Sequence, residues 1–321
     1  MRAITVSRFG GPDVLEVADV PDPTPGPNDL LVRTEAIGVN FIDTYFRTGA
    51  YAVDLPYVAG AEGSGVVTQV GAEVRDVRVG DRVAWSSAPG SYAELVVVPA
   101  SAAVPVPDGV PAPQAASALL QGMTAHYLLH SVYPAQPGDT VLVHAGAGGV
   151  GLILTQLAAA RGVRVITTVS TDAKAELSRA AGAAEVLRYG DDLAEQVRGL
   201  TGGEGVAAVY DGVGASTFEA SLTSTRIRGT VALFGAASGP VPPFDPQRLN
   251  ALGSLFLTRP TLAHYTRDRA ELLWRSGDVF AAIADGRLRI RVGAQYPLDR
   301  AADAHRDLQG RQTTGSVVLI P

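Results

Sequence analysis

The sequence contains no cysteine, only one lysine and few aromatic residues. Without cysteine the chain cannot form disulfides, bind zinc through thiolates or use a cysteine nucleophile. The net charge of −6 offers no attraction for nucleic acid. No apolar run approaches the roughly 20 residues of a membrane-spanning helix, and the N-terminus has a strand pattern rather than a signal peptide. We therefore expect a cytoplasmic protein with neither a nucleic-acid nor a membrane partner.

The pattern along the 321 residues predicts an α/β protein with two domains. Residues 1–122 carry short alternating strands separated by Pro and Gly turns, which is typical of a largely antiparallel β domain. In residues 123–259 strands alternate with helices, which predicts a parallel sheet with right-handed crossovers. Segment 260–321 is too short for a domain of its own, so we expect it to return to the β domain.

The change of pattern begins with two expected helical segments, 111–120 and 124–130. The run Val141–Val143 then leads directly into Gly146-x-Gly148-x-x-Gly151 and a helical pattern. Strand, glycine turn and helix in this order predict a dinucleotide site, because glycine lets the backbone approach a pyrophosphate and the helix N-terminus presents unpaired N–H groups. The predicted contacts in the turn are Gly146, Ala147, Gly148, Gly149 and Val150.

The end of the next strand favours a phosphorylated cofactor. NAD sites usually carry an acidic residue about 20 residues past the first glycine, whereas here the strand ends at Ser170. Asp172 follows as an expected helix N-cap, and Lys174 is the only lysine. Hydroxyls and a cation can accept the 2′-phosphate of NADP(H). The alternative is that Ser170 only starts a helix and Lys174 is solvated.

Several motifs together resemble one known family. They are Gly38–Tyr45, Gly60–Gly65, His144–Gly151, Tyr210–Gly214, Ser254–Pro260 and Thr314–Ser316. The combination resembles the quinone oxidoreductase (zeta-crystallin-like) branch of the medium-chain dehydrogenase/reductase superfamily. The resemblance implies a GroES-like catalytic domain, made from residues 1–122 with the returning segment 260–321, and a Rossmann NADPH-binding domain over 123–259. It also implies a homodimer, which we expect to form through the outer strand near Ser254–Thr258.

The resemblance also implies roles for residues outside the glycine turn. It places the 2′-phosphate near Ser170, Lys174, Tyr189 and Arg311, although an edge aromatic and a solvated arginine are the alternatives for the last two. It places Thr124 at the nicotinamide end, with a helix cap as its alternative. Phe234 and Ser238 are cofactor candidates for a different reason: they follow the carboxyl end of a strand, where ligands bind in open α/β sheets.

The residue set argues against zinc. Zinc alcohol dehydrogenases of the superfamily carry a cysteine where Asn40 stands and a histidine at Ala61. His126 and His130 have helical spacing, yet no third ligand accompanies them. We therefore expect no metal. Without a Lewis acid to stabilise an alkoxide, the expected substrate is an acceptor that is already electron-poor, such as a quinone.

Four residues are candidates for the reacting end of the site: Asn40, Tyr45, Tyr51 and Arg259. Asn40 is expected to donate a hydrogen bond to a substrate oxygen, with a turn-forming asparagine at a strand end as the alternative. Tyr45 and Tyr51 are aromatics suited to stacking on a flat acceptor, or to core packing. Arg259 reaches the substrate or bridges the domains. Asp43 is expected to orient the loop, or to cap or be solvated.

Three functions remain open from the sequence. The first is an NADPH:quinone oxidoreductase, by hydride or one-electron steps. The second is an NADPH-dependent reductase of 2-alkenals, enones or enoyl thioesters, in which Tyr45 or Tyr51 protonates the substrate. The third is an NADPH-binding structural or RNA-binding protein, against which the acidic pI of about 5.4 argues.

Overall fold

The computed structural model describes all 321 residues, which divide into two compact units. The first comprises Met1–Gly122 and Asp268–Pro321, and the second comprises Met123–Arg267. The second boundary thus lies beyond the expected residue 259. The reason is helix α8 (Leu262–Tyr265), whose Tyr265 ring stacks on Tyr127 of the second unit with centroids 4.5 Å apart.

The first unit contains a seven-stranded and a three-stranded sheet. The larger sheet has the order β15-β16-β3-β5-β6-β8, with β7 also paired to β3. Every pairing in it is antiparallel except β15 with β16, so the largely antiparallel β domain is confirmed. The strands of the larger sheet are β3 (Asp29–Val39), β5 (Glu62–Val70), β6 (Arg82–Trp85), β7 (Leu95–Pro99), β8 (Val104–Pro105), β15 (Val292–Pro297) and β16 (Ser316–Ile320). The smaller sheet has β1 (Arg2–Val6), β2 (Glu16–Asp19) and β4 (Tyr57–Val58).

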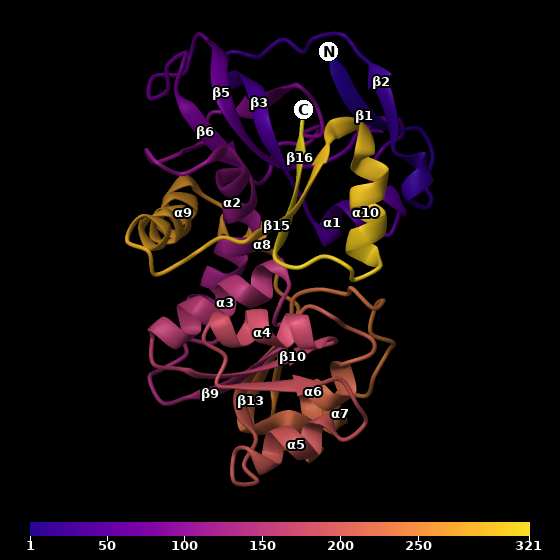
Figure 1. Cartoon of the computed structure of the whole chain (residues 1–321), viewed down its shortest axis with the longest axis vertical. Helices are drawn as coiled ribbons and strands as arrows, with labels where there is room; N and C mark the ends of the chain where they lie inside the picture. The colour runs from indigo at the N-terminus through magenta and orange to yellow at the C-terminus, as the bar shows by residue number, and fades with distance from the viewer. The chain divides into compact units, whose positions relative to one another are not determined.

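The C-terminal segment returns to the first unit, as expected. Strand β16 pairs antiparallel with β3, so that Val318 lies opposite Gly38. Figure 1 shows the yellow β16 beside the indigo β3 and helix α10 (Ala301–Gln309) on the same unit. Ile37, Val317 and Leu319 are almost fully buried in one apolar cluster. Burial of such side chains stabilises a fold by roughly 1.5–3 kcal/mol each, which explains why this segment needs no core of its own.

Helix α2 (Ala112–Tyr127) corrects the expectation of two helical segments. It is one helix, continued by a π-helical turn at Leu128–Val132. Gly122 does not break it; a Cβ at Gly122 would lie 2.8 Å from Val279 Cγ1 in helix α9 (Arg269–Ala284), so the glycine serves close helix packing. Thr124 therefore lies inside a helix and is not a cap, which rules out that alternative.

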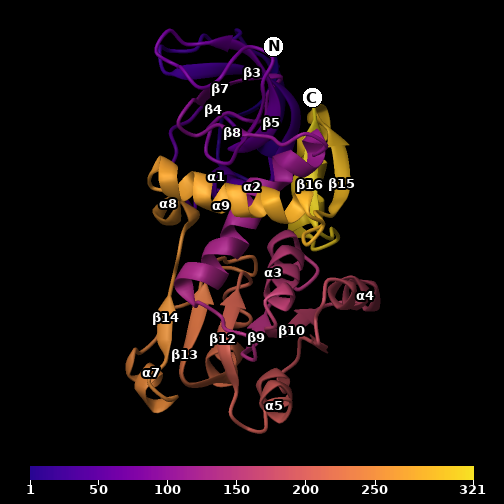
Figure 2. The same cartoon turned by 90° about the vertical axis from the view of Figure 1, so that its left-hand side faces the viewer.

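The second unit is a six-stranded parallel sheet with the order β11-β10-β9-β12-β13-β14. Figures 1 and 2 show α3 and α4 on one face of the sheet and α5 and α6 on the other, which confirms the doubly wound α/β prediction. Its strands are β9 (Thr140–Val143), β10 (Arg164–Val169), β11 (Glu185–Arg188), β12 (Val206–Asp211), β13 (Thr225–Leu233) and β14 (Phe256–Thr258). Its helices include α3 (Gly149–Ala160), α4 (Asp172–Ala180), α5 (Leu193–Gly199), α6 (Phe218–Ser224) and α7 (Gln247–Ala251).

The second sheet is covered on both faces, and its central strands are correspondingly apolar. Leu142, Ile166 and Val209 are fully buried in one cluster with α5 and α6, as expected for parallel strands flanked by helices. This packing fixes the carboxyl ends of the strands, from which the loops of the candidate site emerge. No helix anywhere in the chain combines the length and apolar character required to cross a bilayer.

Candidate functional site

The glycine turn follows the strand at which the sheet changes direction. Successive connections place β10 on one side of β9 and β12 on the other, and ligands bind at this kind of switch point. After β9 the chain passes Ala145, which has a positive φ of 53°, and reaches Gly148, the N-cap of α3. The expected strand, turn and helix are all present.

Two glycines of the turn are required by packing. A Cβ at Gly146 would lie 2.5 Å from Thr167 Cβ, and one at Gly151 would lie 2.2 Å from the Ala145 carbonyl oxygen. Both distances are shorter than any real contact, so the turn can lie this close to β10 and α3 only with glycine. Because the first N–H groups of α3 have no partner within the helix, the turn forms a cradle suited to a pyrophosphate.

A buried polar cluster supports the turn from below, and sequence reasoning did not identify it. His144 is fully buried; its ring nitrogens contact Thr168 Oγ1 at 2.9 Å and Ser221 Oγ at 3.1 Å. Ser221 donates to Asp211 at 2.6 Å, and Asp211 also accepts the backbone N–H of Val213. Burial lowers the pKa of His144, so its ring is neutral, and its hydrogen bonds join the end of β9 to β10 and α6. The signal was a histidine two residues before the first glycine of the motif.

The end of β10 has the features expected for a 2′-phosphate site, with one correction. Thr171, not Asp172, is the N-cap of α4; its Oγ1 accepts the N–H of Lys174 at 3.3 Å. Asp172 instead forms an ion pair with Arg188 at the end of β11. Arg188 was not predicted, and its charge offsets the one carboxylate that would repel a phosphate here.

Tyr189 follows β11 and contacts the glycine turn directly. Its hydroxyl accepts the backbone N–H of Ala145 at 2.9 Å. Because Val169 and Arg188 are paired in register, Ser170 and Tyr189 leave neighbouring strands at the same edge of the sheet. Tyr189 is therefore not only an aromatic residue at the edge of the sheet; it also hydrogen-bonds to the glycine turn. Arg311 belongs to the first unit, where it is exposed with a φ of 56° in the loop before β16, so its contact with a phosphate stays a prediction.

The other predicted residues of the second unit take different places. Ser238 Oγ donates to the Val213 carbonyl at 2.8 Å and accepts the Ser216 N–H at 3.0 Å, so it closes the loop after β12. The Phe234 ring lies so close to Gly212 that a Cβ there would be 2.8 Å from it. Thr124 is buried within α2. Arg259, directly after β14, donates to the Pro260 carbonyl at 3.2 Å.

In the first unit, Asn40 and Asp43 belong to a helix that the sequence analysis missed. Asn40 is the N-cap of α1 (Phe41–Arg47), which begins directly at the end of β3. Asp43 accepts the Asn40 N–H at 2.8 Å and the Tyr92 hydroxyl at 2.9 Å. Burial raises the pKa of Asp43 to about 6, and these two hydrogen bonds partly oppose that shift. Asp43 is thus a buried capping residue, and the solvated alternative is wrong.

The Asn40 side chain is held by a chain of buried hydrogen bonds. Its Nδ2 donates to Glu62 Oε2 at 2.7 Å, and its Oδ1 accepts from Gln121 Nε2 at 3.0 Å. Glu62 also accepts the Leu120 N–H at 2.7 Å, and Ser316 donates to Gln121 Oε1 at 2.7 Å. Burial raises the pKa of Glu62 to about 8. The sequence signal was a carboxylate enclosed by small residues in Gly60–Gly65.

Tyr45 and Tyr51 lie together on the first unit. Their ring centroids are 5.3 Å apart, and the Tyr51 ring meets Phe46 edge-on at 5.6 Å. Tyr51 is 38% exposed and Tyr45 is half-buried, so core packing does not account for them. Stacking of either ring on a planar acceptor stays a prediction.

The residues do not fit a zinc ion. Asn40 occupies the place of a zinc-binding cysteine in related dehydrogenases, and its amide is held by hydrogen bonds to Glu62 and Gln121. His126 and His130 stack ring on ring with centroids 3.9 Å apart, which is a packing contact. No three His, Asp or Glu side chains are grouped as a metal site requires.

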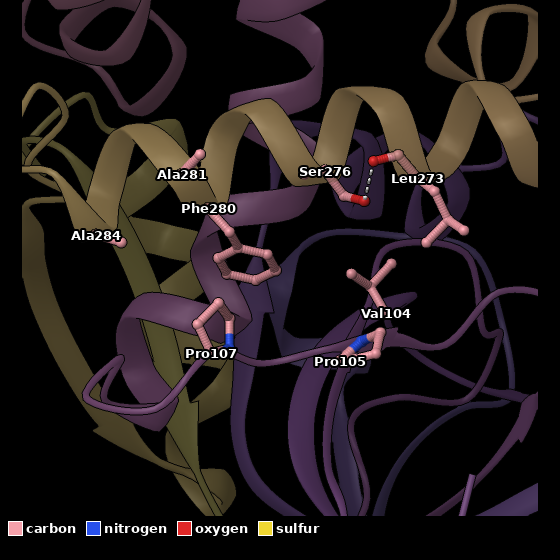
Figure 3. A pocket seen from close by; sticks show the side chains of 9 residues that line it. Val104, Pro105, Pro107, Leu273, Ser276, Phe280, Ala281 and Ala284 are labelled. Carbon is pink, nitrogen blue, oxygen red and sulfur yellow. Dashed lines mark hydrogen bonds between the residues drawn. The ribbon is translucent and has the colours of Figure 1, made fainter. Parts of the chain in front are cut away.

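A hollow of about 290 Å³ lies elsewhere in the first unit, between β8 and α9. Figure 3 shows Val104, Pro105 and Phe280 around it. Its only side-chain hydroxyl, Ser276 Oγ, donates to the Leu272 carbonyl within its own helix at 2.7 Å. None of the predicted site residues lines this hollow, so it is separate from the candidate active site.

The fold and site together define a class of protein. Residues 26–108 match the alcohol dehydrogenase GroES-like domain, and residues 149–271 match the zinc-binding dehydrogenase domain. Despite the name of the second domain, this chain has no group of side chains that could bind zinc. Among curated relatives, the quinone oxidoreductase of Pseudomonas aeruginosa is 45% identical over 100% of this chain and 99% of its own. The 2-haloacrylate reductase of a Burkholderia species is 42% identical over 100% of this chain and 99% of its own.

A solved mycobacterial structure, complexed with NADPH, superimposes with a TM-score of 0.99 at 60% identity, and the match covers 100% of both chains. At these identities over the full length, the chain belongs to the quinone oxidoreductase family. The resemblance inferred from the motifs is thereby confirmed.

Proposed function

We propose that this chain is an NADPH-dependent, zinc-free reductase of quinones. The observation that carries the proposal is the Asn40 amide, fixed by buried hydrogen bonds where a metal-dependent dehydrogenase needs a metal ligand. A protein without a Lewis acid requires an acceptor that is already electron-poor. The reaction is NADPH + H⁺ + quinone → NADP⁺ + hydroquinone, and bound NADPH supplies the reducing electrons.

Residues of the second unit are proposed to bind most of the cofactor, and residues of the first unit to bind the acceptor. The glycine turn and the N-terminus of α3 bind the pyrophosphate, while Ser170, Lys174 and Tyr189 bind the 2′-phosphate, with Arg311 as a further cation. Phe234, Ser238 and Thr124 are proposed to lie along the rest of the cofactor. Asn40 donates to an acceptor oxygen, and Tyr45 and Tyr51 stack on the acceptor. Arg259 is proposed to contact the substrate.

The direct test follows NADPH oxidation at 340 nm, the absorbance of reduced nicotinamide, with 1,4-benzoquinone and 1,4-naphthoquinone against 2-alkenals and 2-haloacrylates. We expect the quinones to give the higher kcat/KM, with NADPH preferred over NADH. Oxidation driven only by alkenals or haloacrylates would favour the second candidate function, which the Burkholderia relative supports. Tight NADPH binding without turnover on any acceptor would contradict both and favour a non-enzymatic role.

We also propose that the protein is a cytoplasmic homodimer that binds no nucleic acid. The support for a dimer is the free edge of β14, the last strand of its sheet, beside the exposed apolar side chains of Phe256 and Ile227. The support for the location is the need for NADPH as reductant. Cell fractionation and sedimentation of the purified protein test these two statements separately.

A further inference from the structure

The Asn40 amide has two chemically different ends, and its neighbours determine which end faces which way. Asn40 Nδ2 faces Glu62 and Oδ1 faces Gln121. A carboxylate only accepts hydrogen bonds, so it selects the NH₂ end of the amide. The NH₂ group has a second N–H, for which the chain provides no partner. Its direction is therefore decided by the orientation of the whole amide.

The orientation is transmitted through three further groups. Gln121 Nε2 donates to Asn40 Oδ1, so Gln121 Oε1 points the other way and accepts from Ser316 Oγ at 2.7 Å. Glu62 itself is anchored by the Leu120 N–H, a donor that cannot change its role. Ser316, Gln121, Asn40 and Glu62 are all more than nine-tenths buried. The hydrogen bonds thus all run in one direction: Ser316 donates to Gln121, Gln121 donates to Asn40, and Asn40 donates to Glu62.

The missing side chain of Gly38 leaves the space that this arrangement needs. Gly38 of β3 lies opposite Glu62 of β5, and a Cβ at Gly38 would lie 2.3 Å from Glu62 Oε2 and 2.4 Å from the Ala116 carbonyl oxygen. The glycine lets the carboxylate lie against the strand and reach Asn40. A buried carboxylate is costly for stability, so its presence here calls for a role beyond packing.

We propose that Glu62, Gln121 and Ser316 are positioning residues that fix the polarity of the Asn40 amide, so that it presents an N–H donor to the oxygen of the acceptor during reduction. This inference rests on the proposed function. The direction of the amide matters because negative charge develops on that oxygen as the acceptor is reduced. An N–H there stabilises the transition state, whereas a carbonyl oxygen would repel it.

The test reverses the amide without removing its hydrogen bonds. In the Glu62→Gln variant, the new NH₂ group meets Asn40 Nδ2, and the two donors force the Asn40 amide to turn over. In the double variant Glu62→Gln/Gln121→Glu, every donor again meets an acceptor: both hydrogen bonds to Asn40 are reversed, while Ser316 still donates to residue 121. We expect both to retain NADPH affinity, measured by quenching of protein fluorescence. The double variant should also keep the wild-type melting temperature.

For both variants we expect kcat with 1,4-naphthoquinone, compared above pH 8 where Glu62 of the wild type is ionised, to fall on the order of 100-fold, the scale of losing one transition-state donor, with little change in KM. Ser64→Ala is the matched control, because Ser64 is buried on the same strand and donates to the Ala112 carbonyl at 2.8 Å outside this chain of bonds; its kcat should stay near the wild-type value. Wild-type kcat in a double variant of normal stability would overturn the proposal. A wild-type enzyme that reduces no quinone would instead contradict the proposed function.

A pH profile provides a second readout. Once protonated, Glu62 can donate to Asn40 Oδ1 and support the reversed amide, so wild-type kcat should rise as Glu62 ionises, at a pH near 8. The ionisable groups facing Glu62 are Asp43 of α1 and Tyr92, both of which interact with its charge. Helix α2 and strands β3 and β16 contribute only uncharged groups, including Gln121 and Ser316. The rise should be absent from Glu62→Gln; its persistence there would contradict the proposed role.

Discussion

At the residue scale, the preference for a phosphorylated cofactor depends on very few charges. Lys174 is the only lysine in the chain, and it lies in the first turn of α4, where Thr171 caps the helix. Asp172 beside it would oppose a phosphate, but Arg188 pairs with it. The cations at the end of β10 are therefore Lys174 and Arg188, of which Arg188 is paired with Asp172.

Replacing Lys174 by alanine should lower the preference for NADPH over NADH. The contact with a phosphate dianion is a charge-assisted interaction worth about 1.5–3 kcal/mol, which corresponds to a roughly 10- to 100-fold rise in KM for NADPH. The KM for NADH should hardly change. Steady-state kinetics with both cofactors measure this, and Arg179→Ala removes an exposed cation from the same helix as a control. An unchanged cofactor ratio in Lys174→Ala would show that Lys174 does not contact the phosphate.

The sequence was most informative where a residue type is required by local geometry. Gly146 and Gly151 could be assigned because no other residue fits the turn. Glu62, Gln121 and Ser316 could not, because their roles depend on side chains that come together from β5, α2 and β16. No spacing in the sequence connects positions so far apart.

At the scale of elements, a hydrogen-bond chain connects α1 to α10. Arginine can only donate, so Arg47 Nη1 donates to His305 Nδ1 at 3.0 Å. His305 must then carry its proton on Nε2, which lies 2.9 Å from the Tyr92 oxygen, and Tyr92 donates to Asp43. The helices thus share one buried chain from a cation to a carboxylate. Helix α1 was missed because its seven residues follow β3 with no intervening loop.

This chain predicts a specific acid sensitivity. Burial and the nearby charge of Arg47 lower the pKa of His305 from 6.5 to about 3. Between these values the unfolded state binds the proton and the folded state does not, so stability falls as pH decreases from 6.5 towards 3, by up to about 1.4 kcal/mol per pH unit. The raised pKa of Asp43 has the opposite effect on stability below pH 6. A variant of His305 is therefore needed to isolate its contribution to the pH dependence of the free energy of unfolding.

The variant His305→Gln should remove this slope and keep both hydrogen bonds, because a glutamine amide can accept from Arg47 and donate to Tyr92. Urea unfolding from pH 4 to 7 should show that wild type loses stability relative to the variant as the pH falls. His264→Gln, at an exposed position on α8, should follow the wild-type curve. Parallel curves for wild type and His305→Gln would mean that the His305 ring does not exclude the proton.

At the scale of the whole molecule, alternation of strands and helices was enough to predict both sheets, because each pattern of burial has its own period. The return of the C-terminal segment to the β domain was inferred from its length, which is too short for a separate domain, and from the family resemblance. Residues 292–297, which form β15, were not predicted as a strand. Half of them are exposed and the strand pairs with β16 alone, so their sequence lacks the continuous apolar character of a central strand.

The free edge of β14 leads to the last prediction. An unpaired edge with exposed apolar side chains favours association, and here Phe256 is 63% exposed and Ile227 is 72% exposed. A two-fold axis would pair β14 with its own copy, so each substitution is introduced twice in the interface. Phe256→Glu should therefore convert a dimer into a monomer in analytical ultracentrifugation, with NADPH binding retained because β14 is separated from the glycine turn by β12 and β13.

Val79→Glu alters another exposed apolar residue, 64% exposed on the first unit, and should leave the dimer intact. A wild-type protein that sediments as a monomer at all concentrations, or a Phe256→Glu variant that stays dimeric, would exclude this interface.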